Sequence, residues 1–150
     1  MKIRNLQAYF KERFPVVNMM LFAIMFLTVY SVSSFFSASA NNSKVNILMG
    51  VLAIISFFFR LRVFDEIKDY KIDCVNHPQR VLQSGRVSIS GLMTVSGLLT
   101  ITEITWSIKN GREVFIFWLL ALGYSLLMRY EFFIGKLLKK SLFLYATMHM

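Results

Sequence analysis

The acidic side chains of this sequence gather in one short segment with the chemistry of a divalent-cation site. Four of the eight acids in the chain are Asp65, Glu66, Asp69 and Asp73, here called the acidic ridge. On an α-helix these positions fall at about 0°, 100°, 40° and 80°, within roughly a third of the circumference. Like charges one turn apart repel, and Mg²⁺ prefers carboxylate oxygens. The spacing is typical of a Mg²⁺ site, and equally of a solvated helix face that carries charge.

A basic loop follows the acidic ridge. It spans residues 76–88, contains a proline and a glycine, and carries Arg80 and Arg86. Lys68 lies on the same helix as the ridge but points elsewhere, at about 300°. Guanidinium groups present a planar fork that matches phosphate oxygens. Carboxylates for a metal ion beside arginines for phosphate would together bind a Mg²⁺-diphosphate, where negative charge must be neutralised. Anchoring at a membrane surface would also account for the arginines, but not for their position beside the acids.

The segments that must position these residues are long and apolar. The chain is 56 % hydrophobic and 17 % charged, with a single cysteine, which excludes a disordered chain, a disulfide scaffold and most soluble domains. About 20 residues cross a hydrocarbon core of about 30 Å. We therefore expect an all-α, polytopic membrane helical bundle in one domain, with four transmembrane helices and the start of a fifth. The expected spans lie near 14–36, 45–64, 87–108, 114–134 and 141–150, the last being incomplete.

The basic residues predict the orientation of this bundle. Alternate loops hold 14 and 3 of the 17 cations, so the N-terminus and the acidic ridge are expected on the cytoplasmic side of the cell inner membrane. Nucleic acid is not an expected partner, because the cations follow the loops. A cleaved signal peptide ending near Ala38-Ser39-Ala40 is the alternative, although the apolar stretch before it is longer than such a peptide needs. Glu103 lies well inside an apolar segment and is a functional candidate for that reason.

Two motifs of the chain resemble those of the UbiA-type intramembrane prenyltransferases. Asp65-Glu66-x-x-Asp69-x-x-x-Asp73 is similar to the first Asp-rich motif of that family, NDxxDxxxD. Arg80-x-Leu-x-Ser-Gly-Arg-x-Ser is similar to its RPLPSGxxS segment, with Val81 and Gln83 in place of two prolines. The sequence Arg13-x-Pro15-x-x-Asn18 is similar to the basic-Pro start of its first span.

The resemblance implies an enzyme with nine transmembrane helices in two related halves, each with one Asp-rich motif. Such an enzyme uses Mg²⁺ to transfer a polyprenyl group from a prenyl diphosphate to an aromatic or similar lipophilic acceptor. The residues that match are expected to act as follows: Asp65, Glu66, Asp69 and Asp73 as metal ligands, and Arg80, Arg86 and Lys68 as diphosphate-binding residues, with Arg13 and Asn18 as further candidates. No covalent nucleophile is implied.

The sequence contains one Asp-rich motif, whereas the family uses two. We therefore interpret the 150 residues as the N-terminal half of such an enzyme, the front of a longer chain. Pairing with a second copy or with a separate C-terminal half would also complete the site. The alternative is a non-catalytic small integral membrane protein or an inactive prenyltransferase fragment. CDP-alcohol phosphotransferases also use clustered aspartates, but the Asp-Gly and Ala-Arg pairs of their motif are missing.

Overall fold

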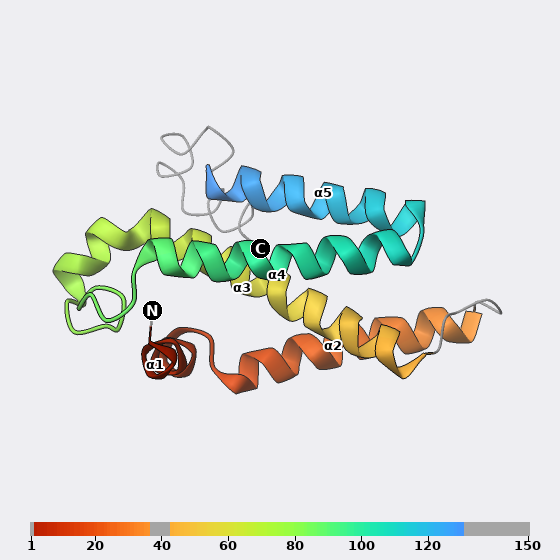
Figure 1. Ribbon diagram of the computed structural model, residues 1–150, viewed down its shortest axis with the longest axis horizontal. Coiled ribbons are helices and arrows are strands. Elements are labelled where there is room, and N and C mark those ends of the chain that lie inside the picture. The colour runs from red at the N-terminus through yellow and green to blue at the C-terminus, as the bar shows by residue number, and fades with distance from the viewer. Residues whose placement is uncertain (1, 37–42, 131–150) are drawn as a thin grey trace, which may run out of the picture.

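The computed structural model describes residues 2–36 and 43–130, and it is all-helical over those ranges (Figure 1). The helices are α1 (Ile3–Arg13), α2 (Val16–Phe36), α3 (Lys44–Asn76), α4 (Ile89–Lys109) and α5 (Arg112–Arg129). The expected all-α class is confirmed for this part of the chain, and α2 to α5 occupy the first four expected segments. The segment 141–150 and the last residues of 114–134 lie outside the described ranges.

Two of the helices, α2 and α3, are long and apolar enough to cross a membrane. The sequence of α2 carries no charge, and none of its side chains is buried in the protein. Apolar surface that surrounds a whole helix is stable in lipid, whereas in water it favours association. These two helices support a membrane location. Because α4 and α5 do not meet the same criterion of length and composition, the expected number of four spans stays a prediction.

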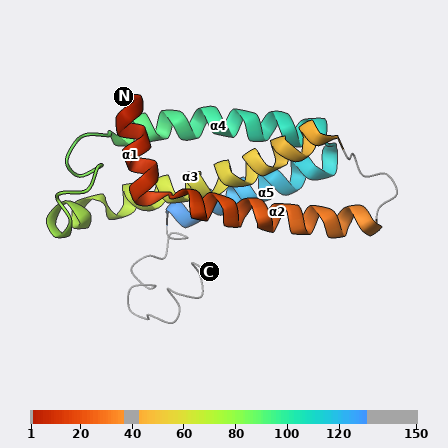
Figure 2. The same cartoon turned by 90° about the horizontal axis from the view of Figure 1, so that it is seen from below.

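A separate helix, α1, precedes the first apolar span and lies crosswise to the other four (Figure 2). This helix was not predicted from the sequence. The break comes from Pro15, because a residue that precedes proline is disfavoured in the helical conformation. Phe14 accordingly leaves the helix with φ −142° and ψ 63°. A new helix then starts, and the Pro15 carbonyl accepts the Asn18 N–H at 3.0 Å.

The buried core lies at the end of the bundle where α1 crosses it. Rings from α1 and α3 pack there, with the centroids of Phe10 and Phe59 5.2 Å apart. The loop between α3 and α4 contributes Val81, Leu82 and Val87, which are all buried. This core fixes α1 and the basic loop against α3, and it therefore sets the positions of the charged residues described below.

The length of α3 determines where the acidic ridge lies. Its 33 residues span about 50 Å, roughly 20 Å more than the hydrocarbon core of a bilayer. The last turns of the helix extend past the start of α4 (Figure 1), and Pro78 follows its end.

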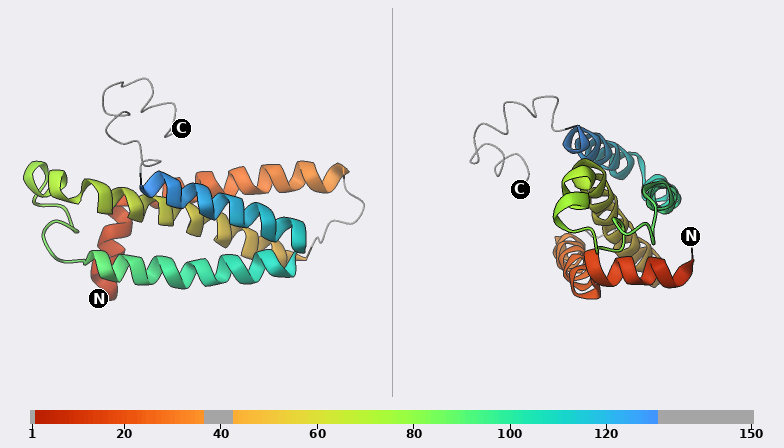
Figure 3. Two further views of the ribbon diagram at one scale, coloured as in Figure 1. Left: turned by 90° about the horizontal axis from the view of Figure 1, so that it is seen from above. Right: turned by 90° about the vertical axis from the view of Figure 1, so that its left-hand side faces the viewer.

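The chain then turns back beside α1 (Figure 3) through a turn in which the Ser84 N–H donates to the Arg80 carbonyl at 2.8 Å. Gly85 closes this turn with φ +76°, a conformation that favours glycine. The Ser88 hydroxyl then caps α4 by accepting the Gly91 N–H at 3.1 Å.

The remaining helices pack along α3. Gly50 allows a close approach, because a Cβ atom at this position would lie 2.1 Å from Cζ of Phe26 on α2. At the far end of the bundle, the Asn46 side chain accepts hydrogen bonds from Trp106 and Asn110, both at 2.9 Å. The expected Asn110-Gly111 turn is present between α4 and α5, with φ +109° at Gly111.

Candidate functional site

The four carboxylates of the acidic ridge fall into two pairs. Glu66 and Asp73, at about 100° and 80° on the helical wheel, face α1 and the basic loop, where arginines contact them. Asp65 and Asp69, at about 0° and 40°, lie on the neighbouring side of α3 next to Lys68. The ridge is therefore one band of acids in sequence but two environments in the structure.

Glu66 is almost completely buried and anchors α1. Its Oε1 accepts from Nε of Arg13 at 2.5 Å and from Nη2 of Arg62 at 2.7 Å. Its Oε2 has no hydrogen-bond partner among the described residues. Burial raises the pKa of Tyr9, on α1, and the Glu66 carboxylate raises it further. A buried carboxylate needs such cationic partners, and Arg13 and Arg62 supply them.

Asp73 joins the acidic ridge to the basic loop. Its Oδ2 accepts from Nη1 of Arg80 at 2.7 Å and lies 3.7 Å from Nη2 of Arg13. The expected closeness of Arg80 to the ridge is thus present. Arg80 and Arg13 already contact ridge carboxylates, so an incoming phosphate would have to share or exchange these contacts.

Asp65 and Asp69 form the more open pair. The Asp65 side chain is 46 % exposed, and its Oδ1 lies 3.4 Å from Nζ of Lys68. Burial raises the pKa of Asp69 above its usual value; Lys68 lowers it, and the neighbouring ridge carboxylates raise it again. Burial is thus the main cause of the raised pKa, and a bound cation would stabilise the charged carboxylate.

The other two phosphate-binding candidates are placed differently. The Arg86 backbone carbonyl accepts from Nδ2 of Asn5 at 2.7 Å, and the Arg86 side chain is exposed. Asn5 and Arg13 are eight residues apart on α1, so this contact lies about 12 Å along the helix from the Arg13–Glu66 pair. Asn18 is exposed at the start of α2. Within the described part of the chain, neither side chain has a contact with the acidic ridge.

Sequence reasoning missed two further residues that organise the site. Glu12 accepts the Val81 N–H with both carboxylate oxygens, at 3.3 and 3.4 Å, which holds the start of the basic loop against α1. Arg62 lies one helical turn before Glu66, and that spacing was a signal available in the sequence. Glu12 gave no such signal, because its partner is 69 residues away.

A second polar cluster lies inside the bundle and involves Glu103. Its two carboxylate oxygens accept from Nη1 of Arg60, both at 2.8 Å, and Oε2 also accepts from Nε1 of Trp118 at 3.0 Å. The Ser56 hydroxyl donates to the same carboxylate. Arg60 was counted among the basic loop residues that predict the membrane orientation. Its side chain is instead only 4 % exposed and pairs with Glu103. Glu103 therefore links α3, α4 and α5 through buried polar contacts.

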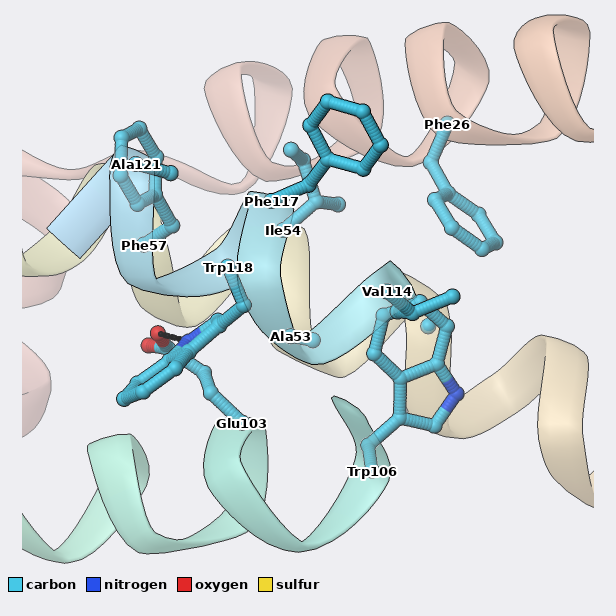
Figure 4. Close-up of a pocket in the computed structure, with 11 residues that line it drawn as sticks. Phe26, Ala53, Ile54, Phe57, Glu103, Trp106, Val114, Phe117, Trp118 and Ala121 are labelled. Atoms are coloured by element: carbon cyan, nitrogen blue, oxygen red, sulfur yellow. Dashed lines mark hydrogen bonds between the residues drawn. The ribbon is translucent and has the colours of Figure 1, made fainter. Parts of the chain in front are cut away.

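Next to Glu103 is an apolar cavity of about 310 Å³ between α2, α3, α4 and α5 (Figure 4). Its walls include Phe26, Phe57, Trp106 and Trp118, and the Glu103 carboxylate lies at one side of it. Since Glu103 is already neutralised by Arg60, the cavity presents no free charge among its described lining residues.

No group of three or more His, Cys, Asp or Glu side chains that could hold a metal ion forms within residues 2–36 and 43–130. Mg²⁺ is usually bound by one or two carboxylates together with substrate phosphate oxygens, so Asp65 and Asp69 are a donor set of the usual size.

Comparison with protein-family models, curated proteins and solved structures finds no match for this chain.

Proposed function

We propose that this chain is the N-terminal half of a UbiA-type membrane prenyltransferase and binds the diphosphate of a polyprenyl donor with Mg²⁺ at the acidic ridge. The observation that carries the proposal is the division of the ridge. Asp65 and Asp69 stand beside Lys68, whereas Glu66 and Asp73 are engaged by arginines from α1, α3 and the basic loop. Arg80 of the second motif thus contacts Asp73 of the first.

The residues of the open pair fit Mg²⁺ by the chemistry of their donors. They offer carboxylate oxygens one helical turn apart, and burial, with a smaller effect of the neighbouring carboxylates, raises the pKa of Asp69. Glu66 Oε2 is a further carboxylate oxygen without a partner in the described residues. When bound, Mg²⁺ would neutralise the diphosphate and assist its departure.

The cationic side chains then have separate roles. Lys68 and Arg80 lie on the two sides of the ridge, where either can donate to diphosphate oxygens. Arg13 holds α1 against α3 through Glu66, and it acts as a positioning residue. Arg86 would approach a long substrate from the α1 side, since its side chain is exposed there.

The surroundings of the site are part of the same proposal. Four spans would place the N-terminus and the acidic ridge on the cytoplasmic side of the cell inner membrane, as the basic residues predict. The lipophilic acceptor and the prenyl chain would enter from the membrane. The resemblance implies carboxylates from two halves, so a second copy or a further polypeptide segment would supply the other set.

The test is binding of farnesyl diphosphate to the chain reconstituted in lipid nanodiscs, with Mg²⁺ and with EDTA. We expect binding with Mg²⁺ to be clearly tighter than binding with EDTA. Asp69→Asn should weaken binding about ten- to a hundredfold, because it removes a charged ligand. Glu113→Gln removes an exposed acid at the start of α5, remote from the ridge, and should leave binding unchanged. Equal binding with and without Mg²⁺ would refute the proposal.

A non-catalytic membrane protein is the second candidate. The observation that favours it is that Glu66 and Asp73 are already neutralised by arginines, as in a purely structural charge cluster. In that case farnesyl diphosphate would not bind, either to the wild type or to Asp69→Asn.

A further inference from the structure

The outer face of α1 has no role in the proposed site. Its exposed residues are Ile3, Arg4, Gln7 and Lys11, with Lys2 at the N-cap, and Glu12 beside them is exposed too. Ile3 is 76 % exposed. Within the described residues, none of the three cations has an acidic partner. The one acid of the helix, Glu12, accepts the Val81 N–H.

The opposite face holds α1 in a fixed orientation. Tyr9 is fully buried, and Phe10 stacks on Phe59. Polar contacts hold both halves of the helix, through Asn5 to the Arg86 carbonyl and through Arg13 to Glu66. The direction of the outer face is therefore set by the fold.

The orientation of α1 relative to the spans suggests what the outer face meets. The helix lies crosswise to α2 and α3 (Figures 2 and 3). With α2 and α3 crossing a membrane, as their length and composition allow, α1 would lie parallel to the membrane surface. Its Phe10 packs on Phe59, so α1 is at the level where α3 leaves the apolar layer.

The chemistry of the outer face fits a lipid surface. Arg4 and Lys11 are seven residues apart and therefore point within about 20° of each other. A helix in the membrane plane that combines cations with an exposed apolar residue is typical of binding to anionic lipids. We propose that the outer face of α1 binds the phosphate headgroups of anionic phospholipids. This surface is independent of the proposed prenyl transfer, because it uses neither the ridge nor Mg²⁺.

The experiment compares spin-labelled phosphatidylglycerol with spin-labelled phosphatidylcholine as lipids in contact with the reconstituted protein. The wild type should prefer the anionic lipid, by roughly fivefold per cation at the lipid positions that touch α1. Lys2→Gln, Arg4→Gln and Lys11→Gln combined should remove most of this preference, as should high salt. The control combines Lys44→Gln, Lys109→Gln and Arg112→Gln at the far end of the bundle, and should retain it.

Equal loss of preference in both triple variants, or no loss in the α1 variant, would overturn the proposal. A second readout is the depth of a spin label at Gln7→Cys in a Cys74→Ser background. We expect the label at the level of the lipid phosphates. A label that lies fully in water would overturn the proposal and point instead to an acidic protein partner.

Discussion

Removal of the Glu103 charge should be among the most destabilising single changes in the described part of the chain. Glu103→Gln keeps an acceptor for Ser56 and Trp118, but it leaves the guanidinium of Arg60 buried without a counter-charge. The Arg60 and Glu103 side chains are only 4 % and 1 % exposed, so water cannot compensate. Breaking a buried pair in this way costs about 3–5 kcal/mol, against under about 1 kcal/mol for an exposed pair.

The assay is reversible unfolding of the chain in mixed micelles, followed by circular dichroism. Glu103→Gln should lower the free energy of unfolding by about 3–5 kcal/mol. Arg60→Met combined with Glu103→Gln should recover most of that loss, because both charges are then gone. Glu113→Gln, an exposed acid, is the matched control. A Glu103→Gln loss below about 1 kcal/mol, or a double variant worse than the single one, would refute the reasoning.

Three further changes test other contacts. Gly50→Ala should destabilise the protein by about 1–3 kcal/mol in the same unfolding assay, because its Cβ would meet Phe26; Gly97→Ala, with open space around it, should not. The raised pKa of Asp69 means that stability falls as pH rises from the usual aspartate pKa through the raised one. Asp69→Asn should therefore have a higher melting temperature than the wild type at pH 7 without Mg²⁺, with this advantage absent at pH 3. Arg13→Gln should increase amide hydrogen exchange in α1 about ten- to a hundredfold over wild type by weakening its anchor on Glu66, and unchanged exchange would contradict that role.

The helical segments follow from the sequence because they depend on local composition. Charge-free stretches place α2 and the first half of α3, and Asn110-Gly111 marks the turn before α5. The helix α1 was missed although Pro15 signals a break, because its stability comes from packing on Phe59 and from an ion pair to a residue 53 positions away. Contacts at such separations leave no periodic signal in one sequence.

In the candidate site, too, local features could be predicted from the sequence, whereas features set by distant contacts could not. The helical wheel correctly places four acids on one part of α3, and even separates Asp65 and Asp69 from Glu66 and Asp73 by angle. Which pair meets arginines depends on where α1 and the basic loop pack, and this is a tertiary effect. Arg60 is the clearest case, since it reads as a loop cation in sequence and lies buried against Glu103 in the structure.

The most direct test of the central claim is the electron paramagnetic resonance spectrum of Mn²⁺, used in place of Mg²⁺, with the reconstituted chain and inorganic pyrophosphate. We expect a bound Mn²⁺ signal that requires pyrophosphate. This signal should disappear when Asp65→Asn and Asp69→Asn are combined, and it should persist in Glu113→Gln. Bound Mn²⁺ that is unaffected by the double substitution would contradict the assignment of the ridge as the metal-diphosphate site.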